Sequence, residues 1–191
     1  YGGVFRHVIG GRPEGWNWLA GQHQGWGGIN ITLQECLVRQ GPLWQVKPEE
    51  QNGPLPNLAK SWSWNANKTS LTMNLVEGVK WSDGEPFDAE DLRFWWEDNV
   101  QDEKVTSRMP KDGMGVGTSM SVVDPYTIRF DFKEPQGPAR VSALAYIQGC
   151  PGPSHILKDH HPRYNPQKTY EDYSNAQPAD DLKNVVSLGM F

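Results

Sequence analysis

The most informative stretch of the chain is Val79-Lys80-Trp81-Ser82-Asp83-Gly84-Glu85-Pro86-Phe87-Asp88-Ala89-Glu90-Asp91. Its Asp83-Gly84 pair favours a tight turn, so a short extended segment is expected to end there. Asp88 suits the N-cap of a helix, and the acidic residues that follow suit its first turn. Turn and cap chemistry therefore account for the stretch, and we expect a structural role for it rather than contact with a ligand.

Helical and strand periods predict the elements on either side. The helix that Asp88 begins is expected to end between Asn99 and Asp102. Further helices are predicted over residues 29–39 and 138–147, a short element around 156–157, a hairpin over 62–75, and strands over 126–132 and 185–188. This irregular order indicates a mixed α/β (α+β) fold rather than an alternating parallel sheet. The buried side of the Asp88 helix is expected to comprise Leu92, Trp95, Trp96 and Val100.

Bulk composition excludes several classes of protein. The 191 residues are 37% hydrophobic, as in a globular protein, and no window approaches the length of a membrane span. The net charge of −5 and the scattered Lys and Arg argue against nucleic acid as a partner. Cys36 and Cys150 lack the spacing of a zinc ribbon or a redox motif. Two buried free thiols are the favoured interpretation, and a disulfide is the alternative.

Four stretches, in order, carry a resemblance to one family. They are Gln34-Glu35-Cys36-Leu37-Val38, Pro56 to Trp64, Val79 to Asp91, and Asp124-Pro125-Tyr126-Thr127-Ile128 with the later Glu134-Pro135. Together they resemble the family 5 extracellular solute-binding proteins, although Cys36 stands where that family usually has glycine. Val185 to Phe191 is similar, more loosely, to the strand with which relatives return to their first lobe.

The resemblance implies an architecture. It is the N-terminal part of a two-lobed, type II periplasmic-binding-protein-like fold, about a third of a full-length relative. Residues 1–44 would form the first segment of lobe I with a ligand-side loop, residues 45–165 an inserted α+β subdomain, and residues 166–191 the return towards lobe I. The second lobe would not be contained in the chain.

The resemblance also implies a receptor rather than an enzyme. It would be extracytoplasmic, periplasmic or at the cell surface, monomeric, and lipid-anchored in the full-length precursor. It would deliver a solute to the membrane permease of an ABC-type importer. Oligopeptide is placed first because it is the commonest role in the family. An oligosaccharide, or a nickel chelate, is the alternative.

The candidate ligand site is the segment before the first matching stretch. Counting back from Glu35 places it inside a glycine-rich irregular loop, where ligands can approach the backbone closely. This loop has no charge for an ionised peptide terminus, whereas its amides, imidazole and indole suit sugars. Packing of Trp26 on the core is the alternative, and Trp16 and Trp18 are weaker ligand candidates. The candidate residues are Gly21, Gln22, His23, Gln24, Gly25 and Trp26.

Other chemistry has weaker support in the sequence. A glycoside-active enzyme needs two positioned carboxylates, but the available acids adjoin one another on or after one helix, as solvated charge does. The histidines near residue 160 do not have metal-ligand spacing, and Gly113 to Gly117 lacks the lysine of a phosphate loop. We therefore expect neither a metal nor another cofactor. The residues considered are Glu97, Asp98, Asp102 and Glu103 for catalysis, and His155, Asp159, His160 and His161 for metal.

Overall fold

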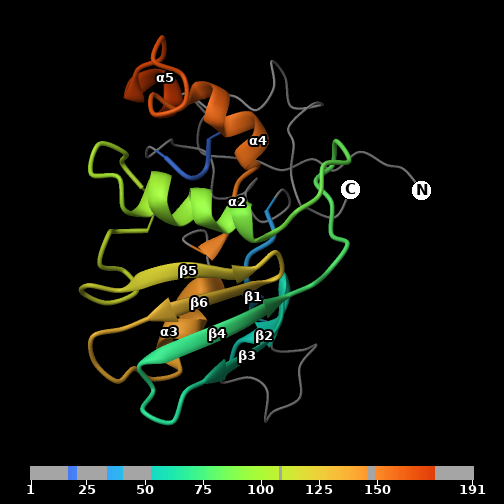
Figure 1. Cartoon of the computed structure of the whole chain (residues 1–191), viewed down its shortest axis with the longest axis vertical. Helices are drawn as coiled ribbons and strands as arrows, with labels where there is room; N and C mark the ends of the chain where they lie inside the picture. Colours follow the sequence, from blue (N-terminus) through green and yellow to red (C-terminus); the bar gives the residue numbers. More distant parts are fainter. Residues whose placement is uncertain (1–16, 21–33, 41–52, 108, 146–148, 175–191) are drawn as a thin grey trace, which may run out of the picture.

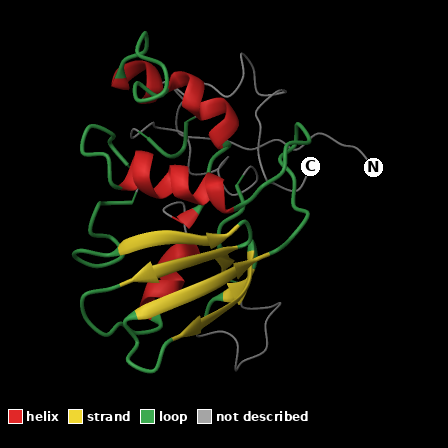
Figure 2. Ribbon diagram, in the orientation of Figure 1, coloured by secondary structure: helices red, strands yellow, loops and turns green. Residues whose placement is uncertain are grey.

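The computed structural model describes residues 17–20, 34–40, 53–107, 109–145 and 149–174. Its centre is a four-stranded antiparallel sheet of order β3-β4-β6-β5, with helices packed beside it (Figures 1 and 2). None of the helices in these ranges is long and apolar enough to span a membrane. The strands of the sheet are β3 (Ala59–Trp64), β4 (Ser70–Leu75), β6 (Thr127–Asp131) and β5 (Ser119–Asp124).

One row of paired residues shows how the sheet meets the core. Met73 on β4 pairs with Trp62 on β3 and with Ile128 on β6, and Ile128 pairs with Val122 on β5. Successive side chains of a strand point to opposite faces of the sheet, and residues paired across strands share a face. These four side chains therefore lie on one face, where Met73 and Ile128 are fully buried. The predicted hairpin and the predicted strand over 126–132 are confirmed. Strand β5 was not predicted, because the residues that it turns inward are only half-buried and its pattern is weak.

The predicted helix begins as its capping residues indicate. The Asp88 carboxylate accepts a hydrogen bond from the Glu90 backbone N–H at 2.8 Å, and Asp91 closes the capping box. Helix α2 (Ala89–Phe94) continues directly into the π-helical segment η3 (Trp95–Val100), which ends where the sequence predicts. Its predicted inward residues are all buried. The predicted extended segment before it is reduced to one bridge, between Lys80 and Pro86.

The prediction of a helix over 29–39 is wrong for the residues that the structure describes. Residues 34–40 are extended, and β1 (Val38–Arg39) pairs with β2 (Leu55–Pro56). Cys36 forms a disulfide with Cys150, and the Leu37 N–H donates to the Gly149 carbonyl at 3.1 Å. These distant partners outweigh the local helical period. The preference for free thiols was also wrong.

The C-terminal half supplies short helices around the long one. Helix α3 (Ala139–Ser142) and the turn η4 (Ala143–Ala145) confirm the predicted helix over the described part of its range. Helix α4 (Ser154–Leu157), turn η6 (Lys158–His160) and helix α5 (Tyr170–Ser174) follow. In Figure 1, α4 and α5 lie on the opposite side of α2 from the sheet. The predicted strand over 185–188 lies outside the described residues.

Candidate ligand-binding site

The predicted ligand loop, Gly21 to Trp26, lies outside the described residues, as does Trp16. The four residues before the loop are described, and they are firmly held. The Asn17 side-chain amide donates to the Tyr173 carbonyl at 2.8 Å, and its oxygen accepts from the Leu19 N–H at 3.1 Å. Ala20 forms an antiparallel bridge with Ser107. The chain therefore enters the predicted loop from a fixed point.

Trp18 belongs to this anchor. Its side chain is 2% exposed, and its indole N–H donates to the Pro151 carbonyl at 3.1 Å. Both the apolar area and the polar atom of the ring are thus already used within the core. This burial favours an anchoring role for Trp18 over direct contact with a solute.

A buried polar chain connects the anchor to the end of the long helix. The Tyr173 hydroxyl donates to the side-chain oxygen of Asn99, whose amide donates to the Phe94 carbonyl at 3.1 Å. Asn17, Asn99 and Tyr173 are each no more than 1% exposed. Because buried amides are costly to leave without partners, this chain fixes α5 and the Asn17 segment against η3. Sequence reasoning missed Asn17 and Tyr173, since no local motif marks contacts across more than 70 residues.

His161 lies fully buried against Tyr173, next to these hydrogen bonds. Its Nε2–H donates to the Asp98 carbonyl at 3.1 Å, and its Nδ1 accepts from the Arg163 N–H at 3.2 Å, so both ring nitrogens are satisfied in the neutral form. Burial lowers the pKa of His161, against the opposing effect of the Asp98 and Asp102 carboxylates. Within the described ranges, no three or more His, Cys, Asp and Glu residues are grouped to hold a metal ion.

The four carboxylates considered for catalysis all have partners. Asp98 is buried, whereas Glu97 and Glu103 lie on the surface. Their contacts join neighbouring elements or neutralise charge, which are structural roles. The contacts are Glu97 with Arg93, Asp98 with Arg163 and Tyr164, Asp102 with Tyr170, and Glu103 with Lys111.

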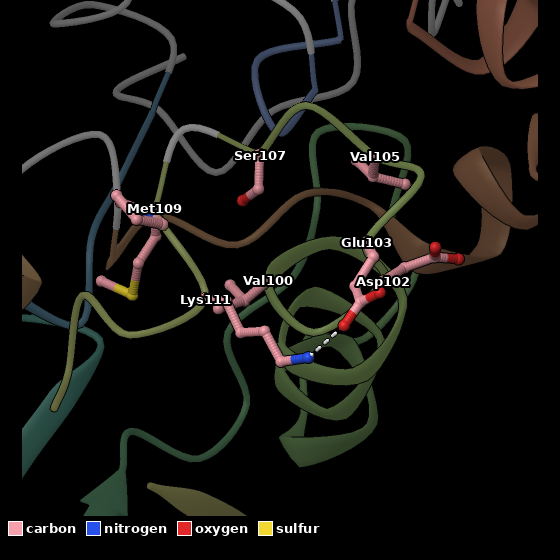
Figure 3. Close-up of a pocket in the computed structure, with 8 residues that line it drawn as sticks. Val100, Asp102, Glu103, Val105, Ser107, Met109 and Lys111 are labelled. Carbon is pink, nitrogen blue, oxygen red and sulfur yellow. Dashed lines mark hydrogen bonds and ion pairs between the residues drawn. The ribbon is translucent and has the colours of Figure 1, made fainter. Parts of the chain in front are cut away.

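A hollow of about 280 Å³ lies beside the anchor, in the segment that follows η3 (Figure 3). Val100, Val105 and Met109 provide apolar lining, and the Ser107 hydroxyl points towards the space that these side chains surround. Ser107 is also the residue that bridges to Ala20, so the hollow adjoins the start of the predicted ligand loop. The described part of the site thus combines apolar walls, a hydroxyl and a fixed backbone.

Comparison with known proteins identifies relatives along the whole chain. Residues 53–191 match the model of the bacterial extracellular solute-binding proteins, family 5 Middle. The chain is 53% identical to a periplasmic alpha-galactoside-binding protein of Rhizobium meliloti (strain 1021), with the match covering 100% of this chain and 27% of the relative.

Solved structures show the same likeness. The periplasmic binding protein MelB of Agrobacterium fabrum C58, in complex with stachyose, matches 96% of this chain and 27% of its own, with a TM-score of 0.85 and 47% identity. The oligopeptide-binding protein OppA matches 85% of this chain and 26% of its own, with a TM-score of 0.66 and 28% identity. The chain spans about a quarter of the length of these relatives. It belongs to the bacterial extracellular solute-binding proteins of family 5.

Proposed function

We propose that this chain forms the N-terminal part of a two-lobed extracytoplasmic receptor that captures an oligosaccharide, in particular an alpha-galactoside. The receptor presents the sugar to the membrane permease of an ABC-type importer. The observation that carries the proposal is the 53% identity, along the entire chain, to a protein described as binding alpha-galactosides.

The relatives reverse the order of solutes that the sequence analysis favoured. The family resemblance alone favours oligopeptide, with oligosaccharide as the alternative. The structure in complex with stachyose resembles this chain more closely than the oligopeptide-binding protein does, with TM-scores of 0.85 and 0.66. The alternative is therefore the better supported of the two.

The chemistry of the described site agrees with a neutral ligand. Two of the three charges that border the hollow neutralise each other, since Glu103 pairs with Lys111 at 2.7 Å, and the third, Asp102, accepts a hydrogen bond from the Tyr170 hydroxyl at 3.0 Å. An ionised peptide terminus would require a charge that is free to pair with it. A sugar requires hydroxyl and amide partners and an apolar face, which the hollow and the composition of residues 21–26 offer.

We assign ligand contact to Gly21, Gln22, His23, Gln24, Gly25 and Trp26, and anchoring of this loop to Asn17, Trp18 and Ala20. Residues 1–44 and 166–191 would belong to the first lobe and residues 45–165 to its inserted subdomain. The Cys36–Cys150 disulfide supports an extracytoplasmic location, because disulfides persist in oxidising compartments.

Titration calorimetry on a full-length receptor that contains this chain tests the proposal. We expect binding of stachyose and of shorter alpha-galactosides, with no heat of binding for di- to pentapeptides. Cello-oligosaccharides, which are beta-linked glucose, serve as a control for selectivity towards alpha-galactosides. Binding of a peptide together with no response to any sugar would contradict the proposal.

A further inference from the structure

We propose that the hollow beside Ser107 is a subsite for one sugar ring of the bound oligosaccharide, separate from the contacts assigned to residues 21–26. This inference rests on the proposed function and adds a location and a residue to it. The Ser107 hydroxyl hydrogen-bonds the ring, and the apolar side chains next to it receive the C–H face of the ring.

The position of the hollow is the first argument. Ala20 and Ser107 form an antiparallel bridge, so the backbone that enters the predicted ligand loop runs beside the wall of the hollow. The described end of this segment, Ala20, is thus next to Ser107, a residue that lines the hollow. The hollow, at about 280 Å³, lies near the lower limit of small-molecule sites, as expected for a compartment that takes one part of a larger ligand.

The lining of the hollow is the second argument. The Ser107 hydroxyl is directed into it and has no hydrogen-bond partner among the residues that the structure describes (Figure 3). Val105 and Met109, which also line the hollow, are buried. A pyranose ring has hydroxyls at its edge and C–H groups on its faces. A hydroxyl without a partner among the described residues, beside apolar side chains, therefore matches a sugar better than it matches a purely apolar side chain.

The charge at the rim is the third argument. The ammonium of Lys111 and the carboxylate of Glu103 are 2.7 Å apart and neutralise each other, with side chains 51% and 79% exposed. The ammonium has three donors and uses one on Glu103, and the carboxylate keeps free lone pairs. The pair can thus donate to and accept from sugar hydroxyls while its net charge attracts neither an acid nor a base.

The experiment compares affinities for stachyose and for a galactose-containing disaccharide in the full-length receptor that contains this chain. The variants are Ser107→Ala, which removes the hydroxyl, Ser107→Thr, which keeps it, and Lys111→Met at the rim. Ser63→Ala is the matched control, because Ser63 is an exposed serine on β3, the strand at the sheet edge opposite β5. Thermal melting of every variant verifies that the fold is kept.

We expect Ser107→Ala to weaken stachyose binding about two- to tenfold, the effect of one neutral hydrogen bond. The affinity for the disaccharide should fall less than the affinity for stachyose. The Ser107→Thr and Ser63→Ala variants should bind both sugars as the unsubstituted receptor does. Parent-like stachyose affinity in both Ser107→Ala and Lys111→Met would overturn the subsite while leaving the receptor function intact. A parent protein that binds no sugar at all would overturn the proposed function and the subsite together.

Discussion

Asp91 is the residue that ties the Val79–Asp91 stretch to the rest of the molecule. Its carboxylate accepts from the Trp81 indole N–H at 3.0 Å and from the Ser154 backbone N–H at 3.0 Å, and the side chain closes the capping box of α2. Burial raises the pKa of the Asp91 carboxyl, although the hydrogen bonds from Ser154 and Trp81 act in the opposite direction. The stretch that identifies the family is thus a junction between α2 and α4.

Asp91→Ala should destabilise the protein by about 2–6 kcal/mol, because two buried N–H groups lose their acceptor at about 1–3 kcal/mol each. Urea unfolding followed by tryptophan fluorescence measures the change. Asp112→Ala is the control, since Asp112 is exposed, and it should change the free energy of unfolding by less than about 0.5 kcal/mol. Equal effects of the two substitutions would show that Asp91 is not a junction.

His161 predicts how stability depends on pH. An unfolded chain protonates this imidazole near its ordinary pKa of 6.5, whereas burial lowers the pKa in the folded state. Between the two values the unfolded state binds more protons, so stability is full above about pH 6.5 and falls as the pH decreases below it. Protonation of Nδ1 would also remove the acceptor of the Arg163 N–H.

Chemical denaturation from pH 7.5 to pH 5 measures this effect. The parent should lose stability on acidification more steeply than His161→Gln, by at most about 1.4 kcal/mol per pH unit. The lowered pKa values of Asp83 and Glu90 act at lower pH, below 3.8 and 4.5, and so lie outside this range. His160→Gln removes a neighbouring imidazole and should keep the parental slope. A His161→Gln slope equal to that of the parent would refute the assignment.

At the scale of elements, sequence predicted what local forces determine. The β3–β4 hairpin, β6 and α2 were recovered because alternation, turn residues and an N-cap lie within a few positions of one another. The extended course of residues 34–40 was missed because its partners, Gly149 and Cys150, are more than 100 residues away. The candidate site divides in the same way. Its predicted loop rests on glycine content and on its position before Glu35 in the family resemblance, and it stays a prediction. The bridge between Ala20 and Ser107 and the contacts of Asn17 could not be predicted, because no periodic pattern records them.

The Cys36–Cys150 disulfide should be a main source of stability for the β1 segment. It links residues that are 114 positions apart in the sequence, and a disulfide across a loop of that length stabilises the folded state by about 2–5 kcal/mol. We expect reduction, or the double substitution Cys36→Ser and Cys150→Ser, to lower the melting temperature by several degrees. Calorimetric scans with and without dithiothreitol measure it. The double variant, which has no disulfide to reduce, should be insensitive to the reductant, and a parent that is equally insensitive would contradict the prediction.

At the scale of the whole molecule, the described residues share one core, whereas the proposed binding site would be completed by the rest of a longer receptor. The sheet, α2 and η3 enclose a continuous hydrophobic core, and burial of its apolar side chains stabilises the described part of the chain. A hydrogen bond contributes about 0.5–1.5 kcal/mol, whereas a micromolar ligand requires about 8 kcal/mol. Relatives are about four times longer, and the remainder of such a receptor would enclose the solute from the other side.

We therefore expect the chain alone to bind stachyose at least about a hundredfold more weakly than the full-length receptor, because in the proposed two-lobed receptor an opposing lobe would supply most of the contacts and exclude water from them. Calorimetric titrations of the two proteins under one set of conditions give the ratio. The near-ultraviolet circular dichroism of the tryptophans must first show that the isolated chain is folded. Micromolar binding by the folded chain alone would mean that residues 1–191 contain the whole site, and the two-lobed receptor would then be the wrong description of how this solute is held.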